Sequence, residues 1–262
     1  MSESPERPES IAFDRAADYY DRTRTVSPEA MRATIEMLVS EIGGRTPCLE
    51  IGMGTGRIAV PLEEAGVPVV GLDLSRPMLA KARGKSRDLP LVEADATTLP
   101  VATGAFGSAI GSWVLHLVAD IGVTVSELMR AVRPGGIVLI SYASFGKSVW
   151  TELTERFARE AGAEMRRVTD DKQEAIDDAF ASRGARVRRL PPIENRRTAS
   201  WEEMIGNLEA GLYSWTWTLD EHTRRSAGER VRAWAEKEFG PLDETRDETR
   251  GEILWRAYDI LG

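Results

Sequence analysis

The stretch Cys48-Leu49-Glu50-Ile51-Gly52-Met53-Gly54-Thr55-Gly56-Arg57 decides the fold of this chain. The apolar run that ends at Ile51 predicts a buried strand, and the glycines after it predict a tight turn into a helix. Because Gly52 and Gly54 have no Cβ, a ligand can lie directly against the backbone of the turn. Open α/β sheets bind their ligands beyond the carboxyl ends of the strands, which is where these glycines fall.

The spacing of the glycines argues against two kinds of phosphate-binding loop. A dinucleotide fingerprint, G-x-G-x-x-G/A, needs a small residue at position 57, and this chain has Arg57 there. A Walker loop needs Gly-Lys-Ser/Thr, which the stretch lacks. The G-x-G-x-G pattern therefore favours a ligand without phosphate, and it speaks against an NAD-dependent oxidoreductase.

Acidic residues stand at the ends of three successive predicted strands. Glu50 lies two residues before Gly52, Asp73 closes the second strand, and Asp95 closes the third. A carboxylate at position 50 attracts an ammonium group. Asp73 can accept hydrogen bonds from both ribose hydroxyls, and Asp95 can accept one from an adenine amino group. Together they favour a cationic, ribose-bearing ligand without phosphate, and S-adenosylmethionine (SAM) is such a molecule.

Short apolar runs alternate with amphipathic stretches from residue 28 to about 190, which is typical of βαβ units and a parallel sheet. Strands are predicted at residues 47–51, 67–72, 89–93, 106–113, 137–142, 186–190 and 252–260. Residues 11–25 are predicted to form a helix followed by a turn. Ser27 caps a helix predicted at 28–41, and Ser75 caps another after the second strand. Further helices are predicted from the end of the glycine turn to 65 and at 120–132, 148–162, 169–182, 201–210 and 220–238. We expect a disordered tail at 1–10, N-terminal lid helices at 11–45, and a SAM-binding domain at 46–262. That domain carries acceptor-site helical insertions at about 143–183 and 200–240.

Composition narrows the classes of partner and site. The 262 residues carry a formal net charge of −8, which disfavours nucleic acid and anionic membranes as partners. One cysteine, Cys48, and two histidines argue against an internal disulfide and against a metal site built on Cys or His. The polar N-terminus has no signal-peptide pattern and no run is long enough for a membrane span, so we expect a cytoplasmic protein.

Four ordered motifs over roughly residues 46–142 resemble those of the class I SAM-dependent methyltransferase family. They are Leu49–Gly56, Gly71–Leu79, Glu93–Ala96 with the Leu-Pro and Ala-Phe pairs after it, and Leu128–Gly136, which ends in Arg-Pro-Gly-Gly. The resemblance implies a Rossmann-like α/β fold: a seven-stranded, mostly parallel sheet flanked by helices, with a helical insertion before an antiparallel last strand. It also implies a methyltransferase that uses SAM as cofactor.

The resemblance assigns the methionine end of SAM to the first and fourth strands. Gly52 and Gly54 would underlie the methionine part, and Met53 between them belongs to the same set. Glu50 would support the amino group, and Ser112, just after the fourth strand, would line the side of the sulfonium.

The adenosine end is assigned to the second and third strands in the same way. Asp73 would bind the ribose, and Leu74 and Met78 would lie against the adenine. Asp95 and the backbone of Ala96 would read the edge of the base.

Residues 13–24, which contain Ala17-Asp18-Tyr19-Tyr20-Asp21, resemble the N-terminal segment of the family's small-molecule branch. There a Tyr-Asp pair closes over the cofactor, so Tyr20 and Arg24 are the candidate lid residues. The alternative is that Tyr19 and Tyr20 only pack the segment against the domain, and the sequence leaves both interpretations open.

Methyl transfer is an in-line displacement, so the protein mainly supplies alignment and a dry site. An oxygen acceptor also needs a base, and His116, just beyond the fourth strand, is the candidate catalytic residue for an alcohol or phenol. The alternative is a histidine bonded to a loop carbonyl. The aromatic run 212–217 either lines an apolar or aromatic acceptor pocket or packs the inserted helices against the sheet.

The expected partner is a small-molecule acceptor, with no nucleic acid, membrane or metal ion. Three alternatives share the SAM site: a non-catalytic SAM-binding regulatory module, a protein methyltransferase, and an RNA methyltransferase, which the acidic charge disfavours. A monomer and a homodimer are both compatible with the sequence.

Overall fold

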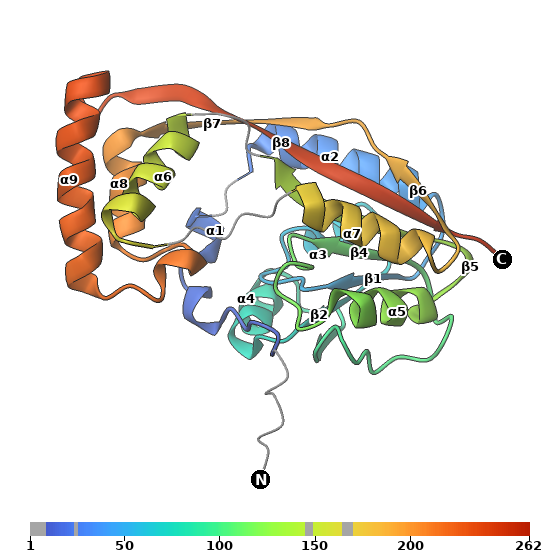
Figure 1. Cartoon of the computed structure of the whole chain (residues 1–262). Coiled ribbons are helices and arrows are strands. Elements are labelled where there is room, and N and C mark those ends of the chain that lie inside the picture. The colour runs from blue at the N-terminus through green and yellow to red at the C-terminus, as the bar shows by residue number, and fades with distance from the viewer. Residues whose placement is uncertain (1–8, 24–25, 145–148, 164–169) are drawn as a thin grey trace, which may run out of the picture.

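The computed structural model describes residues 9–23, 26–144, 149–163 and 170–262 of the chain. The predicted disordered tail at 1–10 falls almost wholly outside these ranges. The described residues form one eight-stranded sheet, drawn in Figure 1. Its strands are β1 Cys48–Ile51, β2 Val69–Asp73, β3 Leu91–Glu93, β4 Phe106–Ser112, β5 Val132–Ser144, β6 Ala185–Arg189, β7 Ile193–Ser200 and β8 Thr245–Ile260.

The strand order is β3-β2-β1-β4-β5-β8-β6, and β7 also pairs with β8. Strands β1 to β5 are mutually parallel, and β8 is antiparallel to β5, β6 and β7. The Rossmann-like, mostly parallel sheet and its antiparallel last strand are therefore confirmed. The expected count of seven strands was one too few. Because the chain reverses from β1–β2–β3 to β4 and β5, the ends of β1 and β4 flank a topological switch point, where open sheets bind ligands.

Helices cover both faces of the sheet, and further helices follow β5 and β7 (Figure 1). They are α1 Tyr20–Thr23, α2 Pro28–Ile42, α3 Ala59–Glu64, α4 Arg76–Lys85, α5 Ile121–Ala131, α6 Val149–Glu160, α7 Asp170–Ala181, α8 Trp201–Glu209 and α9 Glu221–Phe239, with 3₁₀ turns η1 Asp14–Ala16 and η2 Ser214–Thr216. Ser27, Ser75 and Asp120 cap α2, α4 and α5 by accepting a backbone N–H three residues on. These starts match the predicted ones.

The segment 11–25, predicted as one helix followed by a turn, has instead the two short elements η1 and α1 in its described part. The backbone N–H of Ile11 donates to the carbonyl of Leu117 at 2.9 Å, and the hydroxyl of Ser10 accepts from the N–H of Ala119. These groups are therefore committed to the loop after β4 rather than to helical bonds.

Helix α3 begins at Ala59, so Pro61 lies in its first turn, where no helical N–H bond is required.

Two differences from the predicted strands have a pairing cause. Strand β5 begins at Val132 rather than Ile137, since Phe106 pairs with Val132 and Ser108 with Ile137, which leaves Arg-Pro-Gly-Gly as a bulge inside the strand. Strand β7 was not predicted and β8 begins at Thr245 rather than residue 252, because the two form a long antiparallel ribbon. Their sequences are too polar for the period-two pattern to reveal them.

Two apolar clusters fill the two faces of the sheet. One contains Leu38, Ile42 and Leu62 from the α2 and α3 side, and the other contains Leu128 and Phe180 from the α5 and α7 side. Helices α6, α8 and α9, here named the inserted bundle, enclose a third cluster of their own beside the β7–β8 ribbon (Figure 1). Among the described helices, none combines the length and the hydropathy that a bilayer crossing requires.

Candidate functional site

The glycine loop, residues 52–56, joins β1 to α3 through left-handed backbone. Gly52, Gly54 and Gly56 have φ values of +59°, +56° and +79°, which L-residues with a Cβ rarely adopt. A Cβ added at Gly52 would lie 2.7 Å from the Cβ of Val114, so its missing side chain makes room for the loop after β4. A Cβ added at Gly54 would meet only the ring of Tyr20, at 3.8 Å. Of these two glycines, Gly54 thus keeps the open face, beneath the N-terminal segment.

Glu50 points from the centre of the sheet into a fully buried position. Its side chain is 1% exposed, and its Oε2 atom has no hydrogen-bond partner. Burial raises the pKa of Glu50 to about 8, against the opposing effects of the Arg57 guanidinium and the Ala59 backbone N–H. A buried carboxylate oxygen without a partner is costly, so this position favours a cationic group that supplies the missing donor.

Asp73 ties the glycine loop to the end of β2. Its two carboxylate oxygens accept from the backbone N–H groups of Gly54, at 2.7 Å, and Ser75, at 2.8 Å. Burial, together with repulsion from Asp14, raises the pKa of this carboxyl despite those bonds. Each oxygen keeps a lone pair, so the arrangement is compatible with the ribose role that the resemblance implies.

Asp95, at the end of β3, forms a local turn. One oxygen accepts from both the N–H and the hydroxyl of Thr97 at 2.8 Å. Burial raises the pKa of Asp95, but the hydrogen bonds from Thr97 and Ser10 outweigh it, and the pKa falls below its usual value. Its hydrogen bond to Asp95 means that Ser10 joins the N-terminal segment to the predicted adenine end of the site. Ala96, the residue after Asp95, is buried.

The remaining predicted cofactor residues differ in access. Leu74 is 36% exposed, which suits an apolar partner for a base. Met78 is 1% exposed and packs in a cluster with Ala16 and Ala17, so a contact with adenine requires that cluster to open. The side chain of Met53 packs into the core above Gly71, so its contribution to a cofactor would come from its backbone.

The N-terminal segment lies across the glycine loop and α4. The carboxylate of Asp21 accepts from the Thr55 hydroxyl and from Lys85, and Asp18 pairs with Lys81 at 2.7 Å. Tyr20 packs with Phe13, their ring centroids 6.2 Å apart. The lid position predicted for Tyr20 is thus adjacent to Gly54, whereas Arg24, the second candidate, lies outside the described residues.

Ser112 is the last residue of β4, and Trp113 and His116 lie in the loop that follows it. The hydroxyl oxygens of Ser112 and Ser141 are 3.0 Å apart, which links the ends of β4 and β5. Trp113 has φ +53° although it is not glycine, and the Arg57 guanidinium lies 4.5 Å from its ring centroid. Strained backbone of this kind clusters at functional sites, but no local pattern in the sequence points to Trp113. A positive φ is visible only in the structure.

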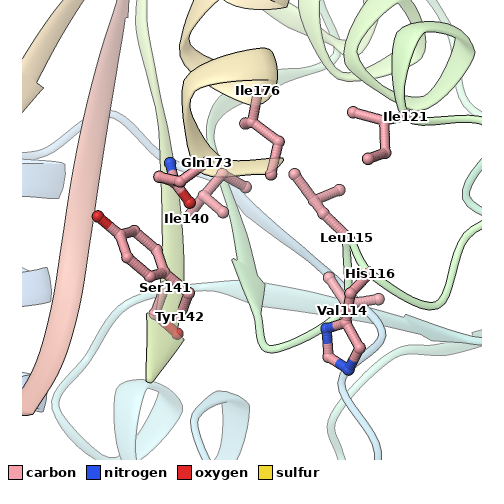
Figure 2. Close-up of a pocket in the computed structure, with 9 residues that line it drawn as sticks. All are labelled: Val114, Leu115, His116, Ile121, Ile140, Ser141, Tyr142, Gln173 and Ile176. Atoms are coloured by element: carbon pink, nitrogen blue, oxygen red, sulfur yellow. The ribbon is translucent and has the colours of Figure 1, made fainter. Parts of the chain in front are cut away.

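A cavity opens beside this loop, between β5, α5 and α7. Figure 2 shows Ile121, Ile140 and Ile176 facing one another, whereas the ring of His116 points away from them. The other lining residues are Val114, Leu115, Ser141, Tyr142 and Gln173. His116 is exposed, so it stands next to the cavity without closing it. Of this set, the sequence pointed only to His116.

The aromatic residues of the insertions mostly pack the inserted bundle. Tyr213 and Trp215 belong to its apolar cluster, and Trp215 packs against Phe157. Trp217 instead lies 5.1 Å from the ring of Phe13 in the N-terminal segment. Among the described residues, no group of three or more side chains has the composition and spacing to hold a metal ion.

Comparison with known proteins agrees with this geometry. The family described as "Methyltransferase domain" matches residues 49–140. A demethylmenaquinone methyltransferase of Renibacterium salmoninarum is 32% identical over 160 residues, which are 57% of this chain and 68% of that protein. A malonyl-[acyl-carrier protein] O-methyltransferase of Xylella fastidiosa is 34% identical over 155 residues, 56% of this chain and 52% of that one.

The match to the Xylella relative thus spans about half of that protein's length. In structure, the YcgJ protein of Bacillus subtilis superposes with a TM-score of 0.60 at 15% identity, covering 88% of this chain and 100% of that one. At that identity the likeness shows the fold alone. From the sequence relatives and the matched domain, the chain belongs to the class I SAM-dependent methyltransferase family.

Proposed function

We propose that this chain transfers a methyl group from SAM to a small-molecule acceptor. The observation that carries the proposal is the buried Glu50 carboxyl, whose Oε2 atom lacks a hydrogen-bond partner. Glu50 lies only a few residues before Gly54, whose backbone is open on one face. An ammonium group supplies the missing donor and the compensating charge. The names of the two sequence relatives, both methyltransferases, support the same activity.

Each residue of the site has its own proposed role toward SAM or the acceptor. SAM, when bound, supplies an activated methyl group. Glu50 would hold its amino group, Asp73 its ribose, and Leu74 one face of its adenine. Ser112 would line the reacting side, and His116 would take the proton from an oxygen acceptor. Alignment of this kind is the main contribution that the protein makes to an in-line displacement.

The cofactor part of the proposal is tested by calorimetry with S-adenosylhomocysteine. We expect Glu50→Gln, which keeps the side chain's shape but not its charge, to weaken binding by at least tenfold. The matched control is Glu64→Gln on the exposed end of α3, which should bind like the parent. Equal affinity in both variants, or no binding to the folded parent protein, would overturn the assignment.

The catalytic part needs a turnover assay. Release of S-adenosylhomocysteine that depends on a small-molecule acceptor supports the proposal. Tight SAM binding with no turnover across acceptor classes favours a regulatory SAM-binding module, and turnover only with protein substrates favours a protein methyltransferase. His116→Ala should lower kcat with an alcohol or phenol acceptor without changing SAM affinity.

Three narrower expectations belong with this proposal. An apolar or aromatic acceptor is supported by the isoleucines that line the cavity between β5, α5 and α7. A cytoplasmic location is supported by the single, buried cysteine. A monomer or a homodimer is expected, and light scattering on the purified chain distinguishes the two.

A further inference from the structure

The cavity between β5, α5 and α7 is lined by one polar group that the fold leaves without a hydrogen-bond partner. Gln173, the first described side chain of α7, is 4% exposed and lines the cavity, and its Oε1 atom has no hydrogen-bond partner. Five of the other lining side chains are apolar: Val114, Leu115, Ile121, Ile140 and Ile176; the remaining three are Ser141, Tyr142 and the exposed His116. A buried acceptor in such surroundings is costly unless something donates to it.

The orientation of the Gln173 amide is fixed by its neighbours. Its Nε2 atom donates to Asp177 at 3.1 Å and to the Tyr258 hydroxyl at 3.2 Å. The Tyr258 hydroxyl donates its own hydrogen bond to the Asp177 carboxylate, at 2.6 Å. Burial raises the pKa of this phenol, which keeps it protonated. A flipped amide would set its oxygen against two acceptors.

The Gln173 oxygen therefore has to face the other way. Figure 2 shows it on the side of Ile140, with the nitrogen directed away.

The network behind Gln173 is electrically balanced. Arg256, 8% exposed, pairs with Asp177 at 3.2 Å and lies 5.3 Å from the ring centroid of Tyr142. It does not line the cavity. Among the described lining residues there is no arginine or lysine, so an anionic group in the cavity would meet an unpaired carbonyl oxygen and no fixed counter-charge.

The cavity adjoins the predicted cofactor site through two residues. Val114 lines the cavity and also fills the space above the bare Cα of Gly52. Ser141 lines it too, and shares a hydrogen bond with Ser112. Val114 thus separates the cavity from the glycine loop.

We infer that this cavity receives the donor-bearing end of the methyl acceptor, and that Gln173 selects a neutral O–H or N–H group over an anionic one. The inference rests on the proposed methyl transfer, because it takes the glycine loop as the SAM site. The cavity volume is only about 20 Å³, so the cavity holds a polar tip while the rest of the acceptor extends outward. Gln173 is a specificity-determining residue here.

The test uses three aromatic probes of the same shape: 2-naphthol, 2-methoxynaphthalene and 2-naphthoate. Each is titrated by calorimetry into the full chain saturated with S-adenosylhomocysteine. We expect 2-naphthol to bind at least tenfold more tightly than either analogue, because only it donates to Gln173 without bringing a charge. Gln173→Met, similar in length and without the amide, should remove the preference while S-adenosylhomocysteine affinity stays unchanged.

A second variant keeps the polar network and fills the space instead. Ile121 is half-buried at the start of α5, so Ile121→Phe should weaken all three probes without unfolding the protein. Equal binding of the probes to the parent, or a preference that survives Gln173→Met, overturns the inference and leaves an ordered water as the partner of Gln173. Loss of S-adenosylhomocysteine binding by the parent is a different result, and it overturns the proposed function instead.

Discussion

The glycine loop and the inserted bundle are held in place by different kinds of interaction. The loop depends on backbone geometry: three residues with positive φ, and a carboxylate, Asp73, that accepts from the loop's own N–H. The bundle depends on side chains: a buried apolar cluster that includes Phe157 and Ile205, and an arginine, Arg232, that bridges Glu202 and Glu209.

The difference explains which part of the chain carries recognisable motifs. A left-handed turn against a neighbouring loop accepts few residue types, so its sequence is narrowly restricted. An apolar cluster accepts many combinations of similar volume, and partly exposed ion pairs contribute little individually. The matched family region, 49–140, accordingly ends before the inserted bundle begins.

The largest effect is expected from Gly52→Ala. The new Cβ would press on Val114 while the backbone is held at φ +59°, and we expect about 2–4 kcal/mol of destabilisation from strain and overpacking, with loss of S-adenosylhomocysteine binding. Gly66→Ala is the matched control, because its φ is +84° but nothing lies within 4 Å of the added Cβ. It should cost about 1 kcal/mol by denaturant unfolding and leave binding intact. Similar costs for the two variants would contradict the role of Val114.

A second test isolates Glu50 through pH. Its pKa is raised to about 8 in the folded chain against 4.5 for an ordinary glutamate. The folded state therefore holds the extra proton between these values. The free energy of unfolding should fall as pH rises through this window, by at most about 1.4 kcal/mol per pH unit from this group, and should level off above pH 8.

Carboxyls with lowered pKa values, such as Asp95 and Asp21, titrate below this window. Glu50→Gln should remove most of the slope between pH 5 and 8 in urea unfolding, and it should make the protein more stable than the parent at pH 8. A variant with the parent's slope would mean that another group is responsible.

Within the inserted bundle, Gly228→Ala should destabilise without affecting the cofactor. The added Cβ would lie 2.5 Å from Cγ of Glu209, which also holds Arg232, so we expect a cost of about 1–2 kcal/mol in urea unfolding. Gly206→Ala in the middle of α8 meets nothing within 4 Å and should stabilise by about 0.5–1 kcal/mol. A marked drop in S-adenosylhomocysteine affinity in either variant would break the separation between the two regions.

The smallest effects are expected at the arginine-rich strand β6. Arg188 bridges Asp259 and Glu41 and so joins the sheet edge to α2; Arg188→Ala should cost about 1 kcal/mol. Arg186 also pairs with Asp259, but its side chain is 67% exposed, and Arg186→Ala should change stability by less than about 0.5 kcal/mol. Thermal unfolding of the two variants side by side provides the measurement. Equal losses of stability in the two variants would mean that the exposed Arg186 contributes as much to stability as Arg188.

Sequence reasoning succeeded for features that depend on neighbouring residues. The caps at Ser27 and Ser75, the strands β1 to β4, and the glycine loop all follow from local spacing. It failed for the strand β7, which pairs with β8 some fifty residues later in the chain. The assigned cofactor roles of Glu50, Asp73 and Asp95 remain predictions, although the structure adds the unpartnered oxygen of Glu50 to the reasons for them.

The sequence by itself determined the Rossmann-like sheet, the glycine loop that lacks a phosphate-binding pattern, and the acidic residues at the ends of the strands. Bare backbone and strand-end carboxylates are local requirements that are written residue by residue. Only the tertiary structure decided that Val114 occupies the space above Gly52. It also decided that the Gln173 amide donates to Tyr258, 85 residues away in the chain, so that its oxygen faces a cavity. Such contacts depend on how distant segments pack, and no periodicity in either segment predicts which side chains will touch.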